Sequence, residues 1–159
     1  MTSVTSMHQL LLASGKSLCT AESCSGGRIA SLITSMAGSS EYFRGGIVSY
    51  QTAIKEMVLH VDAAVIEKYG VVSRETADAM RVCACNLFKA DYAISITGYA
   101  GPTGGTEADP VGTVYISVGT ATQGLTKRVV SQLGERTKIQ DDVARQAIEL
   151  FNKYLEVEL

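Results

Sequence analysis

The pattern of hydrophobic and polar positions changes its period several times along the chain. A spacing of about three to four residues predicts helices, whereas alternation or a short apolar run predicts strands. On this basis, strands are predicted over residues 17–21, 45–51, 91–98, 111–120 and 125–133. Helices are predicted over residues 7–13, 26–36, 63–68 and 138–155, with a short helix capped by Thr52 and a longer one that Ser73 caps and that runs through Leu87.

The order of these elements predicts an α/β fold. Strands separated by helices favour parallel pairs, and the segments 111–120 and 125–133, joined by a short turn, favour an antiparallel hairpin. We therefore expect a three-layer α/β/α sandwich with a mixed, mostly parallel sheet. The 159 residues are 46% hydrophobic and contain no repeat or linker, so residues 1–159 are predicted to form a single domain.

The net charge and the lengths of the apolar segments argue against nucleic acid and membranes as partners. A net charge of -2 without a Lys/Arg cluster argues against nucleic acid. The chain has no signal-like start and no apolar window of about 18 residues, so we expect a cytoplasmic protein without a membrane partner. The cysteines and histidines are scattered or diverge on a helix, and no metal site is predicted.

The segment TAESCSGG, residues 20–27, falls at a predicted strand-to-helix turn. Free N–H groups at the start of the helix after Ser25, with Gly26 and Gly27 leaving room for close approach, could hold a phosphate, a carboxylate or an oxyanion. An equally simple interpretation makes Ser23 or Ser25 the N-cap and the glycines the turn. The segment matches neither a Walker loop nor a dinucleotide fingerprint.

A chain this poor in histidine would need another base to activate a serine. Lys55 follows a predicted strand by one helical turn, and Tyr50 at the strand end could relay or orient its proton. Taken alone, the pattern favours a solvated lysine and a core aromatic. Cys24 is a rival nucleophile, because a thiol at a helix N-terminus is expected to have a lowered pKa. Alternation of side chains would bury Cys24 if Ser23 faces a cleft, so we rank Ser23 above Cys24 and Cys24 above Ser25.

Polar or glycine-rich loops follow the predicted strands at residues 22–27, 51–55 and 98–105. In open α/β sheets, ligands collect beyond the carboxyl ends of strands. The backbone N–H groups of the last loop, GYAGPTGG, could contact a substrate. The alternative is that this segment is only a long surface loop.

The segments TAESCSGG, FRGGIVSYQTAIKEM, YGVVSRETA, ADYAISITGYAGPTGG and DPVGTVYISVGT resemble, in that order, the C-terminal domain of the competence/damage-inducible protein CinA. The resemblance includes the stand-alone form of this domain, the nicotinamide-nucleotide amidohydrolase PncC. It implies an α/β three-layer fold, a homodimer and hydrolysis of nicotinamide mononucleotide to nicotinate mononucleotide and ammonia, without a metal or organic cofactor.

The resemblance also assigns roles to residues. It places the nucleophile at Ser23, the catalytic lysine at Lys55 and an assisting tyrosine at Tyr50. Arg136 is a candidate for the substrate phosphate, with Arg44 as a second. The other candidates for substrate binding are Ser25, Gly26, Gly27, Thr52, Gly98, Tyr99, Ala100 and Gly101.

The chain departs from the family pattern in three places. Gln51 and Thr52 stand where Ser-Asn is frequent, Tyr99 replaces an isoleucine, and Gln140 replaces an arginine of the last helix. A second hypothesis is therefore a non-catalytic or weakly active nucleotide-binding or regulatory paralogue that retains the cleft. Ammonia release from the nucleotide separates the two hypotheses.

Overall fold

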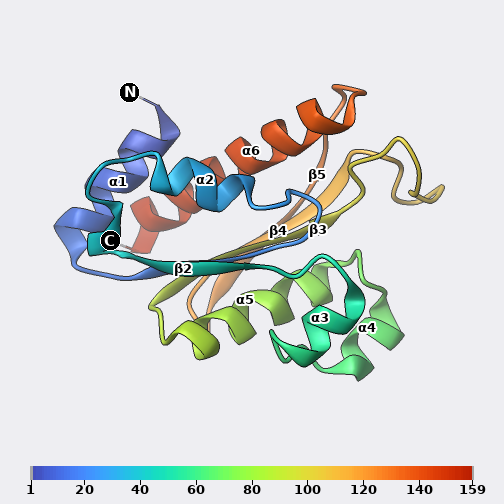
Figure 1. The fold of residues 1–159 in the computed structure, drawn as a ribbon, viewed down its shortest axis with the longest axis horizontal. Helices are drawn as coiled ribbons and strands as arrows, with labels where there is room; N and C mark the ends of the chain where they lie inside the picture. Colours follow the sequence, from blue (N-terminus) through green and yellow to red (C-terminus); the bar gives the residue numbers. More distant parts are fainter. Residues whose placement is uncertain (1, 159) are drawn as a thin grey trace.

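A five-stranded sheet forms the centre of the computed structural model, which describes residues 2–158 (Figure 1). The strand order is β2-β1-β3-β4-β5. The strands are β1 (Leu18–Glu22), β2 (Phe43–Val48), β3 (Tyr92–Gly98), β4 (Thr113–Gly119) and β5 (Gly124–Val130). β1 pairs in parallel with β2 and β3, whereas β4 pairs antiparallel with β3 and β5, so only β4 runs against the other strands.

Helices cover both faces of this sheet. The helices are α1 (Ser3–Ser14), α2 (Arg28–Thr34), α3 (Thr52–Met57), α4 (Ala63–Tyr69), α5 (Arg74–Phe88) and α6 (Arg136–Glu158), with a 3-10 turn at Ser39–Glu41. Figure 1 shows α1, α2 and α6 on one face and α3, α4 and α5 on the other. The predicted three-layer α/β/α sandwich with a mixed, mostly parallel sheet is confirmed.

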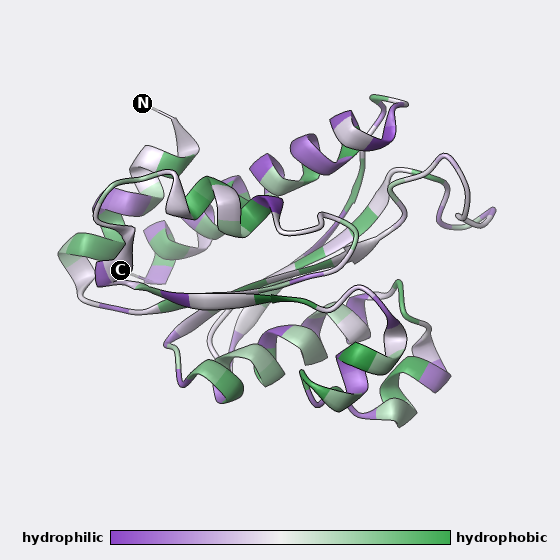
Figure 2. Ribbon diagram, in the orientation of Figure 1, coloured by the Kyte–Doolittle hydropathy of each residue, from purple (hydrophilic) through white to green (hydrophobic). Residues whose placement is uncertain are grey.

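The two faces of the sheet carry separate hydrophobic clusters. One includes Met7, Ile29, Ile94 and Phe151 under α1, α2 and α6, and the other includes Met80 under α5. Figure 2 shows hydrophobic residues along the strands and on the sides of the helices that face them. None of the helices within residues 2–158 is both long and apolar enough to cross a membrane.

Several predicted boundaries shift near the loops. β2 ends at Val48, so Tyr50 and Gln51 belong to a loop and not to the strand. α2 begins at Arg28, because Gly26 and Gly27 have φ of 60° and 95°, which a right-handed helix excludes. Thr52 is the first residue of α3, and the cap position belongs to Gln51, so the prediction of Thr52 as cap is wrong.

Of the other helix ends, the cap of α5 is as predicted, whereas the start of α6 shifts. The Ser73 side chain accepts a hydrogen bond from the N–H of Thr76 and caps α5 as predicted. Gly15 ends α1 with φ of 69°, a conformation that glycine adopts without strain. α6 begins at Arg136, two residues before the predicted start, and this brings the Arg136 side chain to the end of the sheet where β1 and β3 terminate.

Candidate active site

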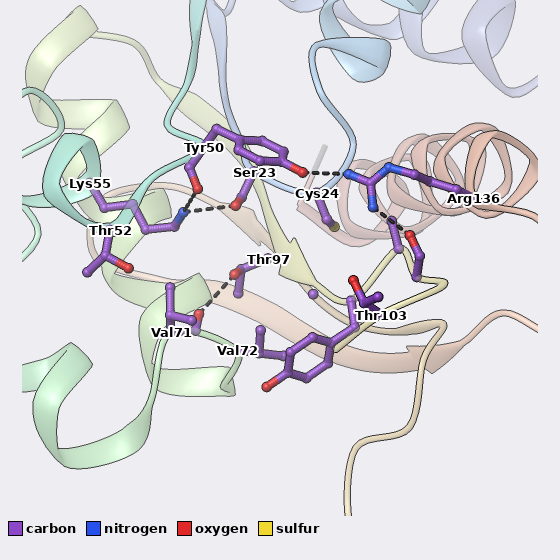
Figure 3. A pocket seen from close by; sticks show the side chains of 14 residues that line it. Ser23, Cys24, Tyr50, Thr52, Lys55, Val71, Val72, Thr97, Thr103 and Arg136 are labelled. Atoms are coloured by element: carbon purple, nitrogen blue, oxygen red, sulfur yellow. Dashed lines mark hydrogen bonds between the residues drawn. The ribbon is translucent and has the colours of Figure 1, made fainter. Parts of the chain in front are cut away.

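A cleft of about 280 Å³ lies at the carboxyl ends of β1 and β3 (Figure 3). Its walls come from the turn after β1, the start of α3, the segment before α5, the loop after β3 and the first turn of α6. The residues that line it are Ser23, Cys24, Tyr50, Thr52, Lys55, Val71, Val72, Thr97, Gly98, Tyr99, Ala100, Gly101, Thr103 and Arg136. The position agrees with the rule that ligands bind beyond strand ends in open α/β sheets.

Ser23 and Lys55 meet in this cleft although they are 32 residues apart. Ser23 directly follows β1, and its Oγ lies 2.8 Å from the Lys55 Nζ. The Lys55 amine also donates to the main-chain carbonyl of Ser49 at 2.5 Å and, at 3.4 Å, to that of Tyr50. The alternative of a solvated lysine is wrong, because Lys55 is 0% exposed.

Burial changes the chemistry of this amine. Loss of water lowers the pKa of Lys55 to about 8 from its ordinary value of 10.5, and the neighbouring Cys24 opposes the shift. Near neutral pH a fraction of the amine is therefore neutral and able to accept a proton. A serine nucleophile requires an adjacent base, and a neutral amine in contact with the hydroxyl can act as that base.

The start of α2 already holds an anion, the carboxylate of Glu22. Glu22 is buried and accepts hydrogen bonds from the N–H groups of Ile29 and Ala30, both at 2.9 Å. The Ser25 hydroxyl donates to the same carboxylate at 2.6 Å. These contacts fix the turn that carries Ser23 and leave the helix start occupied by the protein's own carboxylate.

The structure therefore does not support the predicted role of the helix start in substrate binding. Ser25, Gly26 and Gly27 are not among the described residues that line the cleft. The N-cap interpretation of the serines is also wrong, since Gly27 occupies the cap position of α2 without a side-chain hydrogen bond. Sequence analysis did not identify Glu22 as the residue that holds the turn of Ser23, although an acidic side chain at the end of a buried strand is unusual.

Cys24 lines the cleft, but burial makes its thiol a poor nucleophile. The side chain packs in the core beside α2, as the alternation of side chains predicts. Desolvation raises the pKa of Cys24 to about 12, although Lys55 acts in the opposite direction. The prediction of a lowered pKa is wrong because α2 begins four residues later and directs its free N–H groups at Glu22.

Tyr50 and Arg136 connect across the mouth of the cleft. The Arg136 guanidinium donates to the Tyr50 hydroxyl at 2.5 Å and to the carbonyl of Gly101 at 2.6 Å. Tyr50 is 54% exposed and therefore not the core aromatic that the pattern favoured. Its contact with Lys55 is made by its main-chain carbonyl, while its hydroxyl faces Arg136.

The loop after β3 contributes the predicted wall of the cleft, Gly98, Tyr99, Ala100 and Gly101, and Thr52 lies on the opposite element, α3. A Cβ at Gly98 would stand 2.4 Å from the Thr113 carbonyl oxygen, so only glycine lets the two backbones approach. Two backbone hydrogen bonds of Tyr99, with Thr113 and Gly112, hold the start of the loop.

Several residues of the cleft wall were not predicted, and one predicted candidate, Arg44, lies outside the cleft. Thr97, Thr103, Val71 and Val72 line the cleft without having been predicted. Arg44 lies near the start of β2, donates to the Phe88 carbonyl and is not among the described residues of the cleft wall. Gln140 donates to the Cys24 carbonyl at 2.9 Å and ties α6 to the turn of Ser23. Within residues 2–158, no three His, Cys, Asp or Glu side chains group in a way that could hold a metal ion.

Comparison with known proteins gives one consistent family. The chain is 44% identical over 144 residues to a CinA-like protein of Mycolicibacterium vanbaalenii and 42% identical over 147 residues to a CinA-like protein of Desulfotalea psychrophila. These matches cover 91% and 92% of the chain but 34% and 35% of the relatives. The chain therefore spans about a third of the length of these relatives.

Solved structures agree over the whole fold. The crystal structure of a competence-damaged protein (CinA) superfamily protein from Klebsiella pneumoniae superposes with a TM-score of 0.93 at 31% identity, covering 98% of this chain and 96% of that chain. A competence/damage inducible protein from Agrobacterium tumefaciens gives a TM-score of 0.91 at 32% identity, with coverage of 97% and 93%. The profile of the CinA C-terminal domain matches residues 2–155. With its fold, its relatives and this profile in agreement, the chain belongs to the CinA C-terminal domain family.

Proposed function

We propose that the cleft is the active site of an amidohydrolase that converts nicotinamide mononucleotide to nicotinate mononucleotide and ammonia. The observation that carries this proposal is the 2.8 Å contact between the Ser23 hydroxyl and the amine of the fully buried Lys55. The family resemblance of the sequence motifs supplies the substrate, and the contact supplies a nucleophile and a base for amide cleavage.

The neighbours of Lys55 determine how its amine would work. The carbonyl oxygens of Ser49 and Tyr50 can only accept hydrogen bonds, so the two hydrogens of a neutral amine are directed to them. The lone pair of the amine then faces the Ser23 oxygen. In that state Lys55 accepts the hydroxyl proton while Ser23 Oγ attacks the carbonyl carbon of the amide.

The proton that Lys55 takes from Ser23 leaves with the amide nitrogen. The protonated Lys55 gives it to the leaving nitrogen, the C–N bond breaks, and ammonia departs from an ester between the acyl group and Ser23. Water then attacks this ester while Lys55 accepts a proton from it, the bond to Ser23 Oγ breaks, and Lys55 passes that proton to Oγ, which releases the carboxylic acid and restores the serine. Main-chain N–H groups of the cleft-lining loop 98–101 are the candidate donors to the oxyanion.

The substrate phosphate would be held at the mouth of the cleft by Arg136. Its guanidinium lines the cleft and has two neutral hydrogen-bond partners, Tyr50 and Gly101, which a phosphate could replace with a charged one. The start of α2 is a poorer choice for the phosphate, since the Glu22 carboxylate occupies its N–H groups.

Ammonia release tests the proposal. The parent protein is expected to release ammonia from nicotinamide mononucleotide, and both Ser23→Ala and Lys55→Met are expected to lower kcat by at least about a hundredfold. Binding of the nucleotide without turnover in the parent would favour the alternative of a nucleotide-binding or regulatory protein. Activity that survives both substitutions would exclude the serine and lysine mechanism.

A further inference from the structure

Thr97 is a buried hydroxyl in the cleft that the mechanism above does not use. It lies next to the end of β3, is 1% exposed and faces the same cleft as Ser23 and Lys55 (Figure 3). Its Oγ1 donates a hydrogen bond of 2.9 Å to the main-chain carbonyl of Val71. Val71 belongs to the segment before α5 and also lines the cleft.

The contact with Val71 decides what the hydroxyl offers to a ligand. A threonine hydroxyl has one hydrogen, and a carbonyl oxygen can only accept, so this hydrogen is directed to Val71. What remains on Oγ1 is acceptor capacity. Thr97 therefore provides the cleft with an acceptor and no donor.

The strand holds this acceptor in place. Thr97 pairs with Tyr115 of β4 within the sheet, and its branched Cβ restricts rotation of the side chain. An acceptor fixed in this way discriminates among the groups that a carbonyl carbon can carry. A carboxamide presents N–H donors to it, whereas an ester or a carboxylate presents none and leaves the acceptor capacity of the buried oxygen unused.

We propose that Thr97 is a specificity-determining residue that accepts a hydrogen bond from the carboxamide nitrogen of the substrate. This inference rests on the proposed function, because it assigns the leaving group of that reaction a partner. It makes the site selective for amides over esters with the same acyl group. It also disfavours the carboxylate product, whose oxygen would face the oxygen of Thr97.

Paired substrates test this role. The values of kcat/KM are measured for nicotinamide mononucleotide and for the methyl ester of nicotinate mononucleotide, on the parent, Thr97→Val and Thr97→Ser. Thr97→Val is expected to lower the amide value about tenfold or more and to change the ester value less than about threefold. Thr97→Ser keeps the hydroxyl and is expected to keep the amide preference.

A matched control separates this effect from the loss of any buried hydroxyl. Thr113 on the neighbouring strand is 0% exposed, and its hydroxyl has no hydrogen-bond partner among residues 2–158. Thr113→Val is expected to leave the ratio of amide to ester unchanged. An equal loss for both substrates in Thr97→Val would mean that Thr97 only ties β3 to residue 71, and would overturn the inference. If Thr97→Val does not fold, Thr97→Ala serves the same comparison with the same two outcomes.

Binding measurements test the role of Thr97 even if the protein does not hydrolyse the nucleotide. A parent that hydrolyses neither substrate contradicts the proposed function, and calorimetric titration with the amide and the acid nucleotide then tests Thr97 by itself. The parent is expected to bind the amide form more tightly, and Thr97→Val is expected to lose that difference. A parent that shows no difference between the two nucleotides would overturn the inference.

Discussion

Raising the pH should increase the rate of amide hydrolysis by deprotonating Lys55. With a pKa of about 8, about a tenth of the amine is neutral at pH 7, whereas a lysine at its ordinary 10.5 would be neutral in about 3 molecules of 10,000. The value of kcat/KM is therefore expected to rise about tenfold from pH 7 to a plateau above about pH 9. The second ionisation of the substrate phosphate, near pH 6, is nearly complete at the start of this range.

The assay is ammonia release at low substrate concentration, from about pH 7 to pH 10. Lys55→Met should show a low rate without an inflection near pH 8, because the titrating amine is gone. Lys68→Met, which changes an exposed lysine of α4, should keep the parent profile. A parent profile that is flat over this range, or that still rises steeply at pH 10 without a plateau, would refute Lys55 as the base.

Three further changes test the stability and the charges of the site. Since the pKa of Lys55 is lower in the folded state than in the unfolded chain, the folded state binds fewer protons between about pH 8 and 10.5. Urea unfolding should therefore show the parent gaining stability over Lys55→Met across this range, by up to about 1.4 kcal/mol per pH unit, and a constant difference would contradict the shift. Glu22→Ala removes the acceptor of two N–H groups at the start of α2 and of the Ser25 hydroxyl, and it should lower the free energy of unfolding by about 3 kcal/mol or more. The control Glu67→Ala, on an exposed position of α4, should change this free energy little, and equal effects of the two substitutions would count against the capping role of Glu22. Arg136→Met should raise KM for the nucleotide about tenfold to a hundredfold with less effect on nicotinamide riboside, and an equal effect on both would exclude Arg136 as the phosphate holder.

The elements with a strong period could be predicted from the sequence. The apolar run of β3 and the apolar stripe of α6 extend over enough residues for their type to be clear, and Ser73 marks the start of α5. Boundaries next to the cleft were less accurate, because they depend on backbone conformations such as the positive φ of Gly26 and Gly27. Propensity alone does not determine where such a turn ends.

The candidate site was only partly accessible to sequence reasoning. Ser23 and Lys55 could be selected by chemistry, but whether they touch depends on the path of the chain between β1 and α3. The pKa of Cys24 could not be predicted, since it follows from how completely the folded chain removes water from the thiol. Thr97 was missed because its partner is the main-chain carbonyl of Val71, 26 residues away, which no side chain in the sequence signals.

The most direct test of the account is the identity of the residue that carries the acyl group. The parent protein is mixed with nicotinamide mononucleotide, quenched in acid during turnover, digested and analysed by tandem mass spectrometry of the peptide that contains Ser23 and Cys24. We predict an ester on Ser23 in the parent, and its loss in Ser23→Ala. An acyl group on Cys24, or turnover in Ser23→Ala at the parent rate, would contradict the assignment of Ser23 as the nucleophile.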